Sequence, residues 1–538
     1  MKKINNNYDV IISGTGLAGS IYGIILAKNG LKVLLIEKGQ HPRFAIGEAM
    51  LPQSALWPFI IGQYYDIPEI QHLGHTDQIL EHMGHSCGIK HSIGFGYHEK
   101  GQEIQQDHVH QLIPPHMPFY SESHLMRAEV DHYLVKTAQK YGCDYIDNSE
   151  ITNINIANGL VEVTANQVHY SSKFYIDSSG KNSLLAKNLN YRTGPQELKT
   201  NSRTIFAHFE QVEEFDSLVS DSINLGQTKK LNDGTIHHVF NGGWFWVIPF
   251  GNYNKSKSTI TSVGLTLNRN LYPVDKNISP EEEFFSFVEK YPTIKKHLGG
   301  IKNITNIVRS ERLQFSSNKG IGDHFFFANN TYGFIDPLYS NGMVHTFESI
   351  FLGSKLLIEA FKNNTFGESQ FLKLERLHSM QIHDADKLIS CAYQAMQSFD
   401  TWNGWTQFWL AQVLFHDLWI QRSCFKFFET GDKKYFEDFF TENRPGCHAP
   451  FYESKVKLLN NIQTILNSSD ETSIKSQQIL DLLKSIEWLP KHVYNWGDKN
   501  ERNVDFANLQ KAQELLGWGF QNSPTELRKN LFDFKLPV

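Results

Sequence analysis

Cysteine, net charge and long apolar runs are all scarce in this 538-residue sequence. Its five cysteines, at positions 87, 143, 391, 424 and 447, form no C-x-x-C pair, which argues against zinc, iron–sulfur and dithiol sites. Lys and Arg number 51 against 57 Asp and Glu, so with a formal charge of −6 no global field attracts nucleic acid or anionic lipid. No stretch resembles a signal peptide or a membrane span. We therefore expect a cytoplasmic protein that binds no metal.

Hydrophobic residues, by contrast, are plentiful. They make up 40% of the chain, and aromatic residues make up 13%, including 38 Phe. This composition is far from that of a disordered chain. Because the chain is too long for one ordinary core, we expect two or three subdomains.

The first forty residues predict a dinucleotide-binding unit. In order, they predict a buried strand, a helix and a second strand, over residues 9–13, 17–28 and 32–36. Three glycines in G-x-G-x-x-G spacing, Gly14, Gly16 and Gly19, join the first strand to the helix. Such glycines allow a tight turn, a close approach to pyrophosphate and close helix packing. Glu37 ends the second strand, where an acid accepts from a ribose hydroxyl.

Three later segments resemble elements of the FAD-containing monooxygenase superfamily. They are a helix within residues 124–142, a strand, turn and helix over 174–189, and a strand, loop and helix over 325–361. In that superfamily such elements complete the flavin site, so the resemblance implies FAD as the cofactor. The residues that it assigns to FAD binding, besides the glycines and Glu37, are Arg127, Asp177, Asn330 and Asp336.

Three short motifs resemble signatures of flavin-dependent halogenases. "GWFWVIP", from Gly243, is similar to the family's W-x-W-x-I-P motif. "GEAMLP", from Gly47, is similar to its G-E-S-x-x-P segment, which adds Gly47 to the cofactor site, and "GFIDPLYSNG", from Gly333, is similar to its G-F-I/L-D-P-x-x-S-x-G loop. The motifs occur in the family's order, and the resemblance covers about residues 8–360.

The resemblance implies a division of labour among the site residues. Reduced FAD and dioxygen give a C4a-hydroperoxide, which oxidises chloride or bromide to hypohalous acid. Trp244, Trp246 and Ile248 share one face of a strand and would wall the flavin off from the organic substrate. Core packing is the alternative explanation for this face. The halide would lie on backbone N–H groups where a helix begins, at Ser340, Asn341 and Gly342.

Lys90 is the predicted carrier of the halogen. It stands ahead of Gly94, Phe95 and Gly96, where the family places a lysine that receives hypohalous acid. Burial can lower the pKa of a lysine, which suits the capture of an electrophilic halogen. An ordinary solvated lysine is the alternative.

The sequence departs from the family pattern in two places. Asn329-Asn330 replaces the usual Gly-Asp, which supplies no charge and predicts modest FAD affinity. Tyr339 replaces the glutamate of tryptophan halogenases, so the chain is closer to the phenol and pyrrole halogenases. Glu48, Asp107 or a histidine remains open as the general base. The histidines that cluster around Lys90 suggest no recognised metal spacing.

The predicted fold is α/β, or α+β overall. A Rossmann-like FAD-binding domain occupies residues 1–200 with a halogenation segment at 47–120, and residues 321–366 return to it with the halide loop. Residues 201–320 are expected to insert an antiparallel substrate sheet, in which Asn232-Asp233-Gly234 marks a hairpin. Residues 367–538 are expected to form helices that cover the substrate.

The predicted function is FADH2-dependent halogenation of an electron-rich aromatic molecule, of phenol or pyrrole type, free or attached to a carrier protein. A separate reductase would supply the reduced flavin. Two alternatives stay open: an aromatic hydroxylase on the same flavin fold, and a flavin-binding protein without catalysis. No nucleic acid or membrane partner is expected.

Overall fold

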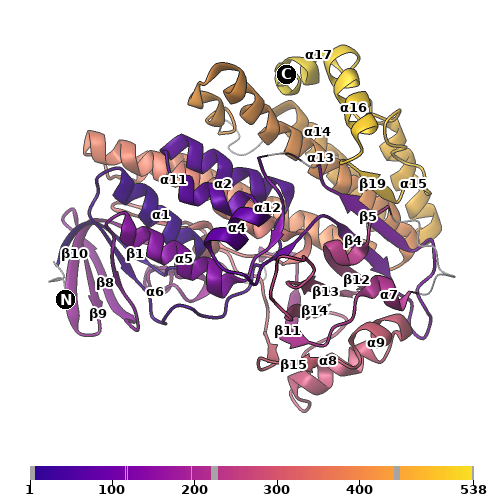
Figure 1. The fold of residues 1–538 in the computed structure, drawn as a ribbon, viewed down its shortest axis with the longest axis horizontal. Helices are drawn as coiled ribbons and strands as arrows, with labels where there is room; N and C mark the ends of the chain where they lie inside the picture. Colours follow the sequence, from indigo (N-terminus) through magenta and orange to yellow (C-terminus); the bar gives the residue numbers. More distant parts are fainter. Residues whose placement is uncertain are drawn as a thin grey trace.

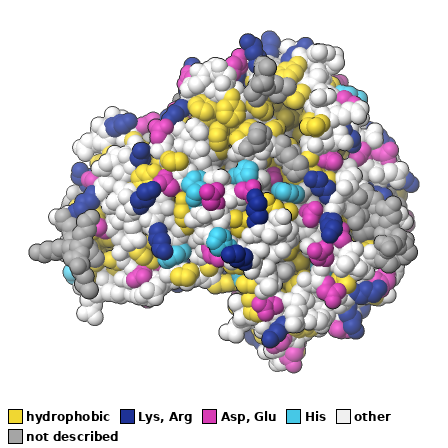
Figure 2. Space-filling model, in the orientation of Figure 1, with side chains coloured by type: hydrophobic (Ala, Val, Ile, Leu, Met, Phe, Trp, Pro, Cys, Tyr) yellow, Lys and Arg dark blue, Asp and Glu magenta, His cyan; other side chains and the backbone are white. Residues whose placement is uncertain are grey.

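The computed structural model describes residues 6–115, 117, 119–194, 197–219, 228–440 and 449–535. Two large sheets and a group of long helices make up the molecule (Figure 1). Cys447 lies outside the described residues, and the other four cysteines are buried free thiols. Basic and acidic side chains are interspersed over the face in Figure 2, in keeping with the small net charge.

The first sheet has the order β17-β18-β10-β1-β2-β7, and β9 and β8 extend it from β10. The strands β18, β10, β1, β2 and β7 run parallel. Its strands are β1 (Asn7–Ser13), β2 (Val33–Ile36), β7 (Asp144–Ile146), β8 (Ile151–Ala157), β9 (Leu160–Ala165), β10 (Val168–Asp177), β17 (Ile321–Gly322) and β18 (Phe325–Phe327). Helix α1 (Leu17–Lys28) packs between this sheet and the helices α5 (Arg127–Lys140) and α11 (Asn341–Asn363). The predicted strand–helix–strand unit is therefore present.

The second sheet has the order β15-β11-β14-β13-β12-β4-β5-β19, with β16 beside β11. Its strands are β4 (Ile93–Tyr97), β5 (Val109–Ile113), β11 (Ser202–Glu210), β12 (Thr235–Phe240), β13 (Gly243–Pro249), β14 (Thr261–Asn268), β15 (Lys302–Asn303), β16 (Val308–Arg309) and β19 (Asn503–Asp505). The strands within residues 201–320 pair with one another antiparallel, as expected. The sheet extends beyond these bounds, where β12 runs parallel to β4 and β19 parallel to β5. Side-chain alternation along a strand carries no information about the direction of its neighbour.

The prediction of a hairpin at Asn232-Asp233-Gly234 is wrong. Residues 231–233 form a 3-10 turn that leads into β12, and the chain reverses instead between β12 and β13, at Asn241 and Gly242. Gly242 has a φ of +76°, which favours glycine. Gly234 serves a different purpose: a Cβ there would overlap the carbonyl oxygen of Ser92 in the neighbouring segment. Gly234 is therefore required by a close approach of two backbone segments and not by a hairpin turn.

Long helices cover one side of the molecule, as expected for the C-terminal region (Figure 1). They are α12 (Leu372–Ala395), α13 (Phe399–Thr430), α14 (Ala449–Leu466), α15 (Thr472–Ser485), α16 (Leu509–Gln521) and α17 (Thr525–Leu531). Most residues of α13 are buried, including Trp402, Trp405 and Trp409, so it lies inside the helical layer. Among the described helices, none has the length and apolar character needed to cross a bilayer.

Shorter elements connect these layers. The helices are α2 (Pro52–Tyr65), α3 (Pro68–Gln71), α4 (Thr76–His82), α6 (Leu184–Asn188), α7 (Phe215–Leu218), α8 (Pro280–Val288), α9 (Pro292–Leu298) and α10 (Asn329–Tyr332). A small sheet pairs β3 (Gly88–Ile89) with β6 (Ser123–His124). It brings the segment before Lys90 against the segment before α5.

Candidate active site

The three glycines of the first motif lie where their spacing predicts. Gly14 has a φ of +81°, and a Cβ there would lie 2.5 Å from the carbonyl oxygen of Ser178. A Cβ at Gly19 would overlap the carbonyl oxygen of Gly14. Gly16 immediately precedes α1, and its hypothetical Cβ would lie 3.7 and 3.9 Å from two guanidinium groups and 3.8 Å from the Asp131 carboxylate, which pairs with one of them. Helix N–H groups and two nearby cations form a good site for a pyrophosphate.

One of those guanidinium groups belongs to Arg43, which sequence reasoning missed. Its Nη2 lies 3.4 Å from Oε2 of Glu37, and the same oxygen accepts from the backbone N–H of Thr15 at 3.0 Å. Burial opposes ionisation of Glu37, but the Thr15 hydrogen bond and the Arg43 charge outweigh it and lower the pKa of this carboxyl. Glu37 is therefore an ionised acceptor beside the glycine turn. The only signal in the sequence was a lone basic residue after Pro42.

Arg127 provides the other guanidinium group. It is the first residue of α5 and is held by Asp131, whose Oδ1 accepts from Nε at 2.9 Å and whose Oδ2 accepts from Nη2 at 3.0 Å. Its Nη1 donates to the carbonyls of Ile46 and Gly47. Gly47 has a φ of +91°, so the chain turns there in a conformation that favours glycine. The predicted pair Arg127 and Gly47 thus forms one structural unit.

A cavity of about 200 Å³, here called the central cavity, is lined by residues of β12 and β13, by the segment around Gly47 and by the start of α11. It brings together most of the predicted site residues: Gly47, Arg127, Trp244, Trp246, Ile248, Asn330, Asp336, Ser340 and Gly342. These residues come from five separate segments of the chain. Their convergence on one cavity is decided by the fold, because they span nearly 300 positions.

The two tryptophans and Ile248 form one wall of the central cavity. All three project from the same face of β13, whereas Phe245 and Val247 point into the core of the second sheet. The two indole rings lie 5.8 Å apart, and the indole N–H of Trp246 donates to Ser262 Oγ at 3.2 Å. Strand alternation therefore separates a core face from a cavity face. Trp244, Trp246 and Ile248 are themselves buried in the main hydrophobic core, so they both pack in the core and line the cavity.

The loop before α11 is held in an unusual conformation. Tyr339 and Ser340 both have positive φ values, 70° and 52°, which cost non-glycine residues of order 1–3 kcal/mol each. Asp336 anchors the loop, because its carboxylate accepts from the backbone N–H of Leu338 and from the hydroxyls of Ser202 and Tyr393. Burial raises the pKa of Asp336 to about 6. The first N–H groups of α11, which have no acceptor within the helix, follow at once.

The predicted halide residues do not all face one cavity. Ser340 and Gly342 line the central cavity, whereas Asn341 lines a second cavity among the C-terminal helices, here called the helical cavity. The loop therefore forms part of the partition between the two. Asn330 lines the central cavity and accepts from the hydroxyl of Thr346 at 3.3 Å.

Lys90 lies behind the central cavity and does not line it. Its side chain is almost fully buried at 1% exposure, and its ammonium donates to the carbonyl of Met50 at 2.5 Å. Burial lowers the pKa of Lys90 to about 7, although the nearby Glu122 raises it. Burial also raises the pKa of the Glu122 carboxyl to about 8. Lys90 is thus a desolvated amine without a full counter-charge at neutral pH, unlike a surface lysine.

Met50 marks the boundary between the two cavities. Its neighbour Ala49 lines the central cavity, and Leu51 lines the helical cavity. The Lys90 ammonium is therefore hydrogen-bonded to a residue that lies between the two cavities. This position follows from tertiary packing and could not be read from the spacing of the motifs.

Asp177 and Glu48 have structural partners. Asp177 is fully buried at the end of β10 and accepts from Ser13, Ser179 and Ser183. It therefore acts on the site by holding the turn after β10, not by lining the central cavity. Glu48 lines that cavity, but its Oε1 lies 2.7 Å from Nε2 of His208.

The clustered histidines separate into distinct settings. His98, His238 and His297 form a hydrogen-bonded chain with two nitrogen–nitrogen distances of 2.9 Å, and burial lowers the pKa of each. His237 lines the central cavity and stacks on Phe95. Within the part of the chain that the structure describes, no group of three His, Cys, Asp or Glu side chains is arranged to hold a metal ion.

Comparison with known proteins identifies the family to which this chain belongs. No family model matches the chain. It is 31% identical to monodechloroaminopyrrolnitrin halogenase PrnC of Pseudomonas fluorescens, over 98% of this chain and 94% of the relative. It is 30% identical to tetracycline 7-halogenase of Kitasatospora aureofaciens, over 97% of this chain and 95% of the relative. The chain belongs to the flavin-dependent halogenase family.

A solved structure of this family matches most of the fold. Halogenase PltM in complex with phloroglucinol and FAD has a TM-score of 0.87 and 31% identity, and the match covers 93% of this chain and 99% of that chain. The protein is thus a flavin-dependent halogenase and an FAD-binding flavoprotein, which confirms the predicted family. Tryptophan 2-halogenase of Chondromyces crocatus is more distant, at 23% identity over 76% of this chain.

Tyr339 lies in an aromatic environment. In this halogenase its ring stacks on Trp409 with centroids 4.4 Å apart, and its hydroxyl accepts from the indole N–H of Trp405 at 2.7 Å. Burial raises the pKa of Tyr339, so the hydroxyl stays neutral. The position that is a glutamate in the tryptophan halogenases' motif is here part of an aromatic core.

Proposed function

We propose that this halogenase oxidises chloride or bromide in the central cavity and passes the halogen by way of Lys90 to an electron-rich aromatic acceptor of phenol or pyrrole type. The observation that carries the proposal is the buried, desolvated position of Lys90 beside the partition between the two cavities, where its ammonium donates to Met50. If this residue only stabilised the fold, an apolar side chain would serve better, because it avoids the free-energy cost of burying a charge. A functional role accounts for its retention.

The residues present fit FAD. Gly14, Gly16 and Gly19 leave room for a pyrophosphate at the start of α1, where Arg43 and Arg127 supply positive charge. Glu37 offers a carboxylate to ribose hydroxyls, and the central cavity extends from Arg127 to the Trp244 wall. Reduced FAD, when bound, supplies with dioxygen the oxidising power that converts a halide into hypohalous acid. A separate flavin reductase would provide the reduced form.

The halide is proposed to bind at the start of α11. Ser340 and Gly342 line the central cavity there, and the positive end of the helix dipole favours an anion. Asp336 also lines this cavity, and its carboxylate is engaged by Ser202, Tyr393 and Leu338. The Trp244, Trp246 and Ile248 wall keeps an organic molecule from the same space.

Lys90 is proposed to receive hypohalous acid and hold the halogen. A neutral amine can accept it as a chloramine, whereas an ammonium can donate a hydrogen bond to it. With its pKa lowered to about 7, Lys90 presents both forms near neutral pH. The acceptor is proposed to be an aromatic ring activated by its own hydroxyl or nitrogen, since Tyr339 supplies no carboxylate to activate an indole. A carrier-bound acceptor is the other form proposed.

Replacement of Lys90 by methionine tests the proposal. The side chain keeps its length but loses the amine, so we expect K90M to consume oxygen and bind FAD normally while it forms no halogenated product. The assay contains a flavin reductase, NADH, chloride or bromide, and phloroglucinol, with products analysed by mass spectrometry. Normal halogenation by K90M would disprove the role of Lys90. An oxygenated product without halogen from the wild type would favour the hydroxylase instead.

A further inference from the structure

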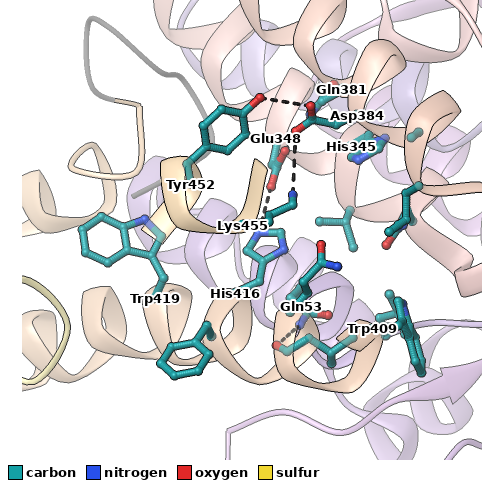
Figure 3. A pocket seen from close by; sticks show the side chains of 18 of the residues that line it. Gln53, His345, Glu348, Gln381, Asp384, Trp409, His416, Trp419, Tyr452 and Lys455 are labelled. Atoms are coloured by element: carbon teal, nitrogen blue, oxygen red, sulfur yellow. Dashed lines mark hydrogen bonds and ion pairs between the residues drawn. The ribbon is translucent and has the colours of Figure 1, made fainter. Parts of the chain in front are cut away.

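The helical cavity has a volume of about 130 Å³ and lies among four helices and the start of α2 (Figure 3). Its walls come from α11, α12, α13 and α14, all of them distinct from the strand that carries the two tryptophans. Asn341 of the halide loop and Leu51, next to the Lys90 acceptor Met50, line it on one side. The cavity therefore lies next to the residue whose carbonyl accepts from the Lys90 ammonium.

Several buried polar atoms on the residues of this cavity have no hydrogen-bond partner within the described part of the chain. The most deeply buried residues that carry such atoms contribute Oε1 of Glu348, Oε1 of Gln53 and Nε2 of Gln412, which come from three different helices. Each residue is at least nine-tenths buried. A buried polar atom without a partner costs about 1–3 kcal/mol. Three such atoms around one cavity point to a ligand that has hydroxyl groups.

Glu348 is the charged member of this group. Its Oε2 accepts from the side-chain amide of Gln381 at 2.6 Å, which fixes the carboxyl in place. Its other oxygen lies 3.5 Å from Nε2 of His416, too far for a good hydrogen bond. Figure 3 shows the two side chains pointing toward each other across the cavity. A hydroxyl that approaches this gap can donate to Glu348 while His416 faces the same oxygen.

The other charged side chains at the cavity already have partners. Asp384 accepts from the hydroxyl of Tyr452 at 3.0 Å and lies 3.7 Å from the ammonium of Lys455. Burial lowers the pKa of His345 to about 4, so this ring is neutral and cannot neutralise Glu348 at pH 7. Glu348 is therefore the carboxylate at this cavity with one oxygen that accepts no hydrogen bond from the described residues.

Helix geometry connects Glu348 to the halide loop. Asn341 and Glu348 are seven residues apart on α11, so they lie on one face of the helix. Trp409, which stacks on Tyr339, forms an aromatic wall between them and the buried tyrosine. An aromatic ring in this cavity would have a flat partner and a carboxylate at its edge.

We propose that the helical cavity holds a phenolic acceptor and that Glu348, assisted by His416, removes the proton of its hydroxyl. This inference rests on the proposed halogenase function. Glu348 would supply the general base that is missing where Tyr339 replaces the glutamate of the tryptophan halogenases. The carboxylate takes the phenolic proton, and the ring carbon ortho or para to the oxygen attacks the halogen of hypohalous acid or of the Lys90 chloramine. The new C–X bond forms as the O–X or N–X bond breaks, and its electron pair stays on the departing oxygen or nitrogen.

Proton transfers complete the balance. The ring carbon loses its proton as aromaticity returns, and that proton neutralises the departing hydroxide to water or the departing amide-like nitrogen to the Lys90 amine. Glu348 returns its proton to the phenolate oxygen of the product. The net change converts the phenol and hypohalous acid into a halogenated phenol and water.

The test compares two acceptors with the same ring and the same three oxygens, one with ionisable hydroxyls and one with methyl ethers in their place. Phloroglucinol has three ionisable hydroxyls, and 1,3,5-trimethoxybenzene has the same ring activated by ether oxygens. We expect E348Q to halogenate phloroglucinol about 100-fold more slowly than the wild type, because loss of a general base costs at least this factor. Its rate with trimethoxybenzene should stay within about twofold of the wild type. H416Q should lower the phloroglucinol rate in the same selective way.

Controls separate this inference from folding and from the proposed function. E359Q makes the same change farther along α11, where Glu359 pairs with Lys355 at the surface, and should leave both rates unchanged. FAD binding and oxygen consumption report folding. An equal loss with both acceptors, or no loss with either, would overturn the role of Glu348. If the wild type itself releases no hypohalous acid to monochlorodimedone and halogenates neither acceptor, the proposed function fails, and this inference fails with it.

Discussion

The buried position of Lys90 leads to a prediction about stability that is independent of any turnover assay. Burial lowers the pKa of its amine from 10.5 to about 7, which corresponds to about 5 kcal/mol of destabilisation of the ammonium. At pH 7 about half of the folded molecules have Lys90 deprotonated, which reduces the net destabilisation of the folded state to about 4 kcal/mol. K90M removes the cost but also loses the hydrogen bond to Met50, worth about 1.5–3 kcal/mol.

We therefore expect K90M to be more stable than the wild type by about 1–3 kcal/mol at pH 7. The sign of its pH dependence follows from the lowered pKa. The unfolded lysine keeps its proton up to about pH 10.5, so the destabilisation is full below pH 7 and disappears as the pH rises toward 10.5. The stability advantage of K90M should shrink accordingly between pH 7 and pH 9.

Urea unfolding at several pH values, followed by tryptophan fluorescence at a fixed FAD concentration, measures this difference. K230M is the matched control, because the side chain of Lys230 is 61% exposed and its replacement should change stability by less than about 0.5 kcal/mol. Finding K90M less stable than the wild type at pH 7 would refute the reasoning, as would a difference that stays constant up to pH 9. The combination of gained stability and lost halogenation would identify a residue retained for function.

Three other predictions concern the central cavity. G19A should weaken FAD binding by at least about 100-fold, since its Cβ would overlap the Gly14 carbonyl, whereas G300A, which meets no atom within 4 Å, should bind FAD normally in a fluorescence titration. W246A should cost about 3–5 kcal/mol in stability and raise the ratio of peroxide or oxygenated product to halogenated product, and an unchanged ratio would argue against a wall. D336N should raise the KM for chloride about tenfold through loss of the loop anchor, while an unchanged KM in steady-state assays would separate the loop from halide binding.

The local elements were largely predictable because each depends on a short range of sequence. The strand, helix and strand around the three glycines occur as the pattern indicates, and α1 matches its predicted bounds. Trp244 and Trp246 lie on one face of β13, as strand alternation predicts, and Phe245 and Val247 lie on the other. The family resemblance carried by three motifs was confirmed by relatives that span nearly the whole chain.

Strand direction and turn position were not predictable in the second sheet. Its parallel pairs join β12 to β4 and β19 to β5, across separations of more than a hundred residues. Asn232-Asp233-Gly234 has the composition of a hairpin but serves a close backbone contact with Ser92. In both cases the deciding interaction was with a distant segment, which local patterns do not encode.

The sequence by itself determined the strand–helix–strand unit with its three glycines, because this unit depends on residues at short spacings. Its motifs carried the resemblance to the halogenase family and named nine of the residues that line the central cavity. Only the tertiary structure decided that Arg43 faces the glycine turn, that Lys90 is buried against Met50, and that Glu348 and His416 meet in a cavity between helices. Burial and proximity between distant segments set the pKa of an amine and the availability of a carboxylate. Those two quantities arise from packing, so no spacing along the chain could reveal them.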